Sequence, residues 1–182
     1  MKGLIFTQLS AMIEEQQGLA FLNSVIEESK LPSGGSYTQG GQYDPVEIHA
    51  ILACMERRLG IPEEFLLRSF GEYLLVSMAG LYPVFFEVED LKHFLLSVDR
   101  HIHVEVEKLY PDSDLPTFEY RDEGGSDLTI FYRSKKKLCA LAEGLISGAS
   151  RHFEEDCSLI HSTCMHRGDP QCTFELSIYD KK

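Results

Sequence analysis

The chain has 182 residues, 43% of them hydrophobic and 25% charged, as is ordinary for a soluble globular protein. Its formal net charge of -12 argues against nonspecific binding to nucleic acid or to an anionic membrane surface. We find no segment apolar enough to span a bilayer and no small-residue cleavage site near the N-terminus, so we expect a cytoplasmic protein.

The first 110 residues predict helices. Apolar residues at three- and four-residue spacing indicate helices over residues 3–16 and 19–29. A polar, Gly-rich connection follows at 32–43. A helix is then predicted to begin with Asp44 as its N-cap and Pro45 at its first position, and to end at Gly60. The next helix is predicted between Pro62 and Gly80. A longer helix is predicted from about residue 89 to a stop at Pro111, with these apolar residues along one stripe: Leu91, Leu95, Val98, Ile102 and Leu109.

After Pro116 the pattern changes to strands. Residues 117–134 predict two strands around a Gly-Gly turn, residues 136–153 predict a helix, and residues 157–166 and 172–179 predict a final pair of strands. We therefore expect an α+β fold in a single domain over 1–182. A helical lobe is followed by a mixed lobe that contains an antiparallel sheet plus helices.

Cysteines and histidines gather near the C-terminus, in "HSTCMHRGDPQC" at 161–172. The chain has an odd number of cysteines, unevenly spread, which favours reduced thiols, metal ligands or redox sensing over a disulfide framework. The five are Cys54, Cys139, Cys157, Cys164 and Cys172.

His161, Cys164 and Cys172 supply three ligands, one short of a closed tetrahedral site. On a regular strand His161 and Cys164 point to opposite faces, so the strand must end or bend for them to converge. Cys139 on the preceding helix is the best candidate for the fourth ligand, with His166 and Cys157 as competitors. Four such ligands predict a structural site; partly buried free cysteines are the alternative.

Two further stretches are ambiguous on their residues alone. His101 and His103 lie on the long helix, where a lone His is usually solvated or hydrogen-bonded. Tyr132, Ser134 and Lys136 share one face if their strand persists, and two hydroxyls and a cation can hold a carboxylate. An ordinary solvated strand end is the alternative interpretation.

Taken together, these segments resemble the haem nitric oxide/oxygen-binding (H-NOX) family, the bacterial relatives of the soluble guanylate cyclase haem domain. The specific features are a His seven residues before "YP", a Pro six residues after that Tyr, and a Tyr-x-Ser-x-basic motif before a helix with "EGL". The resemblance covers essentially the whole chain, through "MKGLIF", "FGEYL", "HVEVEKLYPDSDLPTF", "FYRSKKKLCALAEGLISGASRHF" and "HSTCMHRGDPQC".

The resemblance implies a haem b bound between two lobes: an N-terminal, distal helical lobe over about 1–60 and a C-terminal, haem-ligating lobe with the sheet over 61–182. His103 is then the proximal iron ligand, and Pro116 presses on the porphyrin. Tyr132 and Ser134 match the first two members of the family's Tyr-x-Ser-x-Arg clamp for the haem propionates. The third member is Lys136. Its ammonium is a flexible point charge, whereas the family has an Arg, whose guanidinium is a rigid bidentate donor.

The distal pocket is implied to be apolar. Ile5, Leu141 and Leu145 match its positions, and members that bind oxygen stably carry a Tyr at the position of Leu141. Leucine cannot donate a hydrogen bond to bound dioxygen, so the resemblance implies a sensor that binds NO and CO but not O2. A zinc-containing subset of bacterial members further implies a zinc ion held by Cys139, His161, Cys164 and Cys172.

The implied function is a switch rather than an enzyme. NO breaks the iron–His103 bond, the helical lobe rotates, and a separate partner responds: a histidine kinase, or an enzyme that makes or degrades cyclic di-GMP. A second hypothesis is a zinc/thiol redox sensor with haem in a supporting role. A zinc hydrolase is disfavoured, because it needs an open coordination position and a nearby general base.

Overall fold

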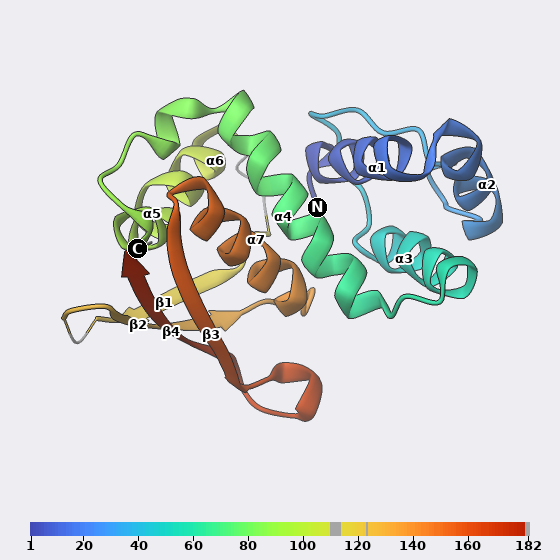
Figure 1. The fold of residues 1–182 in the computed structure, drawn as a ribbon. Helices are drawn as coiled ribbons and strands as arrows, with labels where there is room; N and C mark the ends of the chain where they lie inside the picture. The colour runs from blue at the N-terminus through green and yellow to red at the C-terminus, as the bar shows by residue number, and fades with distance from the viewer. Residues whose placement is uncertain (110–113, 123, 181–182) are drawn as a thin grey trace.

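The N-terminal part of the molecule is helical, as predicted. The structure is a computed structural model that describes residues 1–109, 114–122 and 124–180 (Figure 1). The Asp44 carboxylate accepts a hydrogen bond of 2.9 Å from the backbone N–H of Val46, so it caps its helix in the predicted way. The first four helices are α1 (Gly3–Gln17), α2 (Leu19–Ser29), α3 (Val46–Leu59) and α4 (Glu63–Leu81).

The long helix predicted from residue 89 is divided. A 3-10 turn, η1 (Pro83–Phe86), precedes α5 (Leu91–Ser97), the π-helical segment η2 (Val98–His103) and α6 (Val104–Leu109). The prediction of one regular helix is thus wrong in its centre, where the wider π turns place His103 at the end of η2. Such turns insert a residue, occur frequently at functional sites, and leave no simple spacing signal. The stop predicted at Pro111 lies outside the described residues.

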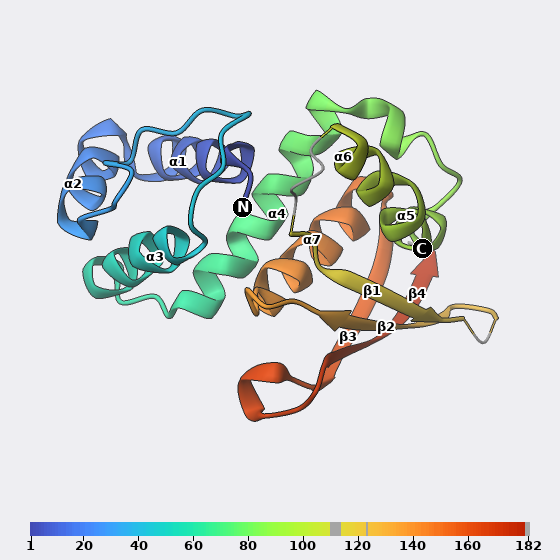
Figure 2. The same cartoon turned by 180° about the vertical axis from the view of Figure 1, so that it is seen from behind.

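The C-terminal part contains a four-stranded antiparallel sheet in the order β1-β2-β4-β3. Alternate residues of the second strand, Leu128, Ile130 and Tyr132, are buried on one side of the sheet. Helices α5 and α7 pack against this side of the sheet, which confirms the predicted α+β class (Figure 2). The elements are β1 (Thr117–Arg121), β2 (Asp127–Arg133), α7 (Cys139–His152), β3 (Glu155–Thr163), the 3-10 turn η3 (Met165–Arg167) and β4 (Cys172–Asp180).

Two hydrophobic clusters form the core, and α4 contributes to both. Leu67, Phe70 and Leu74 pack with α1, α2 and α3, whereas Leu75 packs with α5, α7 and the sheet. In Figure 1, α4 lies between the helical part and the sheet, with α7 beside it. The division into lobes near residue 60 therefore stays a prediction, since the helix that follows that residue is shared. Among the described residues, no helix has the length and hydropathy needed to cross a membrane.

Helices α4 and α7 cross closely because glycines line the crossing. A Cβ atom on Gly71 would lie 2.4 Å from the carbonyl oxygen of Leu141, and one on Gly144 would lie 2.1 Å from that of Arg68. Neither distance allows a side chain, so the two backbones touch directly. The crossing thereby fixes which residues of α4 face which residues of α7.

We predict that Gly144→Ala destabilises the protein by about 1–3 kcal/mol, because its methyl group meets backbone that cannot move aside. Gly80→Ala is the matched control on α4, since a Cβ there meets nothing within 4 Å. It should stabilise by about 0.5–1 kcal/mol through helix propensity. Chemical denaturation measures both. Equal effects of the two substitutions would contradict the close crossing.

Candidate functional site

His103 ends the π-helical segment with a largely buried side chain, 17% exposed. Its Nδ1 lies 3.3 Å from Asp99 Oδ1, one turn earlier, so the other ring nitrogen, Nε2, points away from that carboxylate. The ring centroid lies 5.5 Å from that of Phe118 on β1. Burial lowers the pKa of His103, against a smaller opposite effect of Asp99. A neutral imidazole with Nδ1 held and Nε2 turned outward is a suitable ligand for iron.

The clamp motif lies at the end of β2 and in the turn before α7. Tyr132 is buried, and burial raises its pKa to about 12, so its hydroxyl stays neutral. Ser134 Oγ accepts a hydrogen bond of 3.2 Å from the backbone N–H of Lys136. The Lys136 side chain is 8% exposed, and its ammonium contacts both the carboxylate of Asp114, at 2.7 Å, and the backbone oxygen of Asp114. Sequence reasoning missed Asp114, which lies 22 residues from its partner and gives no local signal.

A row of rings connects the predicted iron ligand with the clamp. The Phe118 ring centroid lies 5.5 Å from that of His103 and 5.4 Å from that of Tyr132. Pro116 stands half-buried two residues before Phe118, immediately ahead of β1. The structure thus brings His103, Phe118 and Tyr132 together, whereas Phe118 was not singled out from the sequence.

The predicted distal residues lie in the first hydrophobic cluster. Leu141 on α7 is buried, and Ile5 on α1 and Leu145 on α7 are partly buried against the same cluster. Leu145 also contacts the second cluster. All three side chains are aliphatic, so none can donate a hydrogen bond to a ligand placed beside it.

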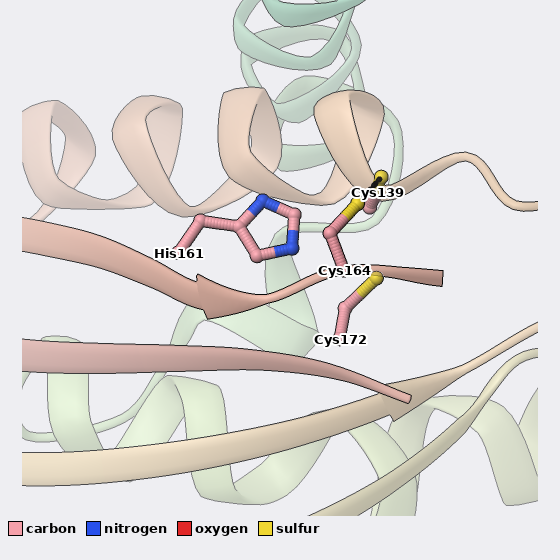
Figure 3. A group of neighbouring side chains, drawn as sticks. All are labelled: Cys139, His161, Cys164 and Cys172. Carbon is pink, nitrogen blue, oxygen red and sulfur yellow. Dashed lines mark hydrogen bonds between the residues drawn. The ribbon is translucent and has the colours of Figure 1, made fainter. Parts of the chain in front are cut away.

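The cysteines and the histidine of the C-terminal region converge. Figure 3 shows Cys139, His161, Cys164 and Cys172 turned toward one another, and their ligand atoms all lie within 4.8 Å of one another. We call this group the four-ligand cluster. Cys139 Sγ lies 3.8 Å from Cys164 Sγ. Two thiolates on one tetrahedral zinc, each at about 2.3 Å, are separated by about 3.8 Å, so this spacing suits the metal.

A bulge in β3 lets the ligands converge. His161 pairs with Phe174 and Thr163 with Thr173, so the register shifts by one residue between them. That shift breaks the alternation that would otherwise send His161 and Cys164 to opposite faces. Cys164 then leaves the strand, where its backbone N–H donates a 2.7 Å hydrogen bond to Asp169. The bend predicted from the sequence is therefore present.

The chemistry of the four-ligand cluster favours a cation. Its three cysteine residues are buried, and His161 Nε2 is buried without a hydrogen-bond partner among the described residues. Burial and the neighbouring Cys172 and Cys164 raise the pKa of Cys139, and burial also raises that of Cys172. Without a positive charge, the thiols of Cys139 and Cys172 thus stay neutral beside an unsatisfied nitrogen. A zinc-like ion would satisfy all four and stabilise the thiolates.

The competing ligands lie elsewhere. His166 Nε2 is 2.7 Å from the carbonyl oxygen of Lys137, and Cys157 Sγ contacts the carbonyl oxygen of Ser158. Cys54 is buried in the first cluster, with its thiol facing Glu28 at 3.5 Å. The structure brings Cys139, and neither competitor, to the other three ligands.

The clamp and the four-ligand cluster share a strand pair. Tyr132 on β2 pairs directly with Cys172 on β4, and Cys139 starts the helix that follows the clamp. A displacement of β2 or β4 would therefore change both the clamp and the four-ligand cluster.

Comparisons with known proteins agree on one family. The model of the haem-NO-binding family matches residues 2–161. An Fe(II) unliganded H-NOX protein from K. algicida has 29% identity and a TM-score of 0.91, over 100% of this chain and 98% of that one. An H-NOX protein from S. oneidensis in the Fe(II)NO ligation state has 29% identity and a TM-score of 0.93, over 99% and 100%. An S. oneidensis H-NOX domain in the Fe(II)CO state has 28% identity, a TM-score of 0.90 and full coverage of both chains. Among curated proteins, no match was found.

We predict an unusual pH dependence for alkylation of Cys157. Burial, and to a lesser extent Glu155, raise its pKa to about 11. The thiolate is the reactive form, so the rate should rise about tenfold per pH unit from pH 7 and level off only near pH 11. Mass spectrometry of alkylated peptides gives the rate, and Cys157→Ser identifies the signal. A plateau near pH 9, the usual thiol range, would contradict the burial of this sulfur.

Proposed function

The chain belongs to the haem-NO-binding (H-NOX) family of haem-based gas sensors, and we propose that it is a sensor selective for NO over O2. Members of this family are sensor domains, not enzymes, and they bind NO and CO. The observation that carries the proposal is the buried, neutral His103 beside Phe118 and the Tyr132 clamp. These groups suit a haem b whose iron supplies the gas-binding position.

His103 would hold the iron through Nε2, because Nδ1 faces Asp99. Tyr132, Ser134 and Lys136 would bind the propionates. The Lys136 ammonium is already paired with an anionic carboxylate, that of Asp114. A haem propionate would replace the Asp114 carboxylate at the ammonium or share the ammonium with it. Lys136 therefore suits propionate binding, although an ammonium lacks the bidentate geometry of the guanidinium that the family has here. Pro116 would press on the ring from its position ahead of β1.

Gas selectivity follows from the apolar distal side. Stable O2 binding requires a hydrogen-bond donor near the ligand, because the bound dioxygen is polar. Leu141, Leu145 and Ile5 provide none, and the chain contains no Trp. NO and CO depend less on such a donor, so this pocket would select them.

The proposed switch is the release of His103. His103 would hold the iron and the haem would supply the NO-binding chemistry, so release of the imidazole would let η2 and α6 move relative to the first cluster. Ligand binding shifts such an equilibrium only by its different affinity for the two arrangements. Because α4 packs in both clusters, it would carry the movement between the lobes over 1–60 and 61–182. A histidine kinase or a cyclic di-GMP synthase or phosphodiesterase in the cytoplasm would respond.

We further propose that the four-ligand cluster binds zinc, as in the zinc-containing bacterial subset. Three sulfurs and one imidazole form a closed set, which suits a structural ion rather than a catalytic one. His161 Nε2, buried and without a partner among the described residues, supports this assignment. The ion would hold the β3–β4 hairpin to the start of α7.

Redox sensing through the same cluster is the second candidate function. Cys172 pairs with Tyr132 across the sheet, so loss of a thiolate by oxidation would act directly on the clamp. Under this hypothesis mild oxidation releases zinc and changes the partner's activity, whereas NO has no effect. The two functions make opposite predictions for NO.

We predict that NO added to the reduced, haem-loaded protein breaks the bond between His103 and the iron. The same protein should bind CO and should not bind O2. Anaerobic absorbance titrations with each gas test this. Leu141→Tyr should gain O2 binding, because its hydroxyl can donate to bound dioxygen. Leu145→Phe, equally bulky but apolar, is the control and should not gain it. Stable O2 binding by the unmodified protein would refute the proposed selectivity.

We predict one zinc per chain, lost on strong chelation together with a fall in the unfolding midpoint. Cys172→Ser should bind zinc at least tenfold more weakly, roughly the loss expected when a metal site is impaired. Cys54→Ser is the control, since Cys54 is also buried but lies in the other cluster. Metal analysis and thermal unfolding give the result. Zinc content that is insensitive to Cys172 would refute the assignment.

A further inference from the structure

Two hydrogen bonds connect the four-ligand cluster to helix α4. His161 Nδ1 lies 2.6 Å from Glu143 Oε1, and Arg68 Nε donates a 2.5 Å hydrogen bond to Glu143 Oε2. A carboxylate paired with arginine can only accept, so His161 must carry its proton on Nδ1. Its Nε2 then has a free lone pair and is the buried atom that faces the thiols.

The positions of these residues follow from the close crossing of α4 and α7. Glu143 lies one helical turn after Cys139, so α7 supplies both a ligand and the group that orients another ligand. At Gly144 the α7 backbone touches the carbonyl of Arg68, which brings the guanidinium within reach of Glu143. The side chains of Glu143 and His161 are 10% and 17% exposed, so water competes little for these contacts.

We propose that Glu143 and Arg68 are positioning residues of the four-ligand cluster and couple its metal occupancy to helix α4. The inference rests on the metal site proposed above. An ion on Nε2 fixes the His161 ring, and the fixed ring keeps its Nδ1–H on Glu143. Without the ion, Nε2 has no partner in the part of the chain that the structure describes, so the ring can turn and Glu143 loses one of its two partners. The Arg68 contact then loosens.

Coupling of this kind is reciprocal. If the metal stabilises the contact between Arg68 and Glu143, a displacement of α4 must weaken metal binding by the same factor. Since α4 packs in both hydrophobic clusters, a movement between them would change the affinity of the site for zinc.

A second contact across the same helices provides a matched control. Glu72 lies four residues after Arg68, and Ser147 lies four residues after Glu143. Glu72 Oε1 accepts a hydrogen bond of 2.8 Å from Ser147 Oγ and forms an ion pair with Arg151 Nη2 at 2.6 Å. This contact also joins α4 to α7 through a carboxylate. None of its three residues belongs to the four-ligand cluster. Glu72→Gln therefore removes a comparable interaction away from the proposed metal.

The test measures the affinity of the purified, reduced full chain for Zn2+ by competition with a chelating dye. Glu143→Gln should bind Zn2+ about 10–100-fold more weakly than the unmodified protein, as expected for a partner of a metal ligand. Arg68→Met should weaken binding by a smaller factor, and Glu72→Gln should leave it unchanged. Circular dichroism of each metal-free variant checks its fold.

Amide hydrogen exchange supplies the second readout. Zn2+ should slow exchange in α4 around Arg68 in the unmodified protein and in Glu72→Gln. In Arg68→Met it should still slow exchange in the β3–β4 hairpin but no longer in α4. A merely structural salt bridge would not separate these two responses.

The outcomes separate this inference from the proposal on which it rests. A chain that binds no Zn2+ in any form overturns the metal site itself, and the inference with it. Zn2+ binding with unchanged affinity in Glu143→Gln, or with an unchanged α4 response in Arg68→Met, overturns the inference alone.

Discussion

The close crossing of α4 and α7 determines the arrangement of the remaining structure. Gly71 and Gly144 remove the side chains that would separate the two helices, so backbone meets backbone. Residues of α4 then reach the first cluster on one side and the second cluster on the other. A larger separation would leave Arg68 out of reach of Glu143. The crossing therefore sets the geometry of side chains that are themselves far apart in the sequence.

Helix α7 uses its different faces for different purposes. It begins with Cys139 in the four-ligand cluster and directs Leu141 into the first hydrophobic cluster. One turn after Cys139, it presents Glu143 to His161. Because a helix is rigid along a few turns, these groups cannot shift independently. The proposed gas-binding pocket and the four-ligand cluster thus share one helix and are not separate modules.

Local structure could be predicted from the sequence, and long-range partnerships could not. Apolar spacing and Pro/Gly boundaries located five helices, α1 to α4 and α7, and four strands, because those signals act within a few residues. The four ligands were also proposed, since three lie within 161–172. Arg68 and Glu143 are 75 residues apart, however, and their contact depends on a helix crossing that no local pattern encodes. The π turns before His103 likewise have no spacing signature. The prediction that His103 rather than His101 ligates iron came only from family resemblance.

The two proposed inputs, a gas on haem and the occupancy of the thiol site, meet at the same elements. Tyr132 of the clamp pairs with Cys172 of the four-ligand cluster. Glu143, which lies beside that cluster, contacts Arg68 on α4. Two ligands that favour different arrangements of one pair of helices must affect each other's binding, whatever the route between them. Such coupling requires only that each ligand distinguish the arrangements. The sensor and redox hypotheses thus differ in which input moves α4 against α7, while the responding structure is common to both.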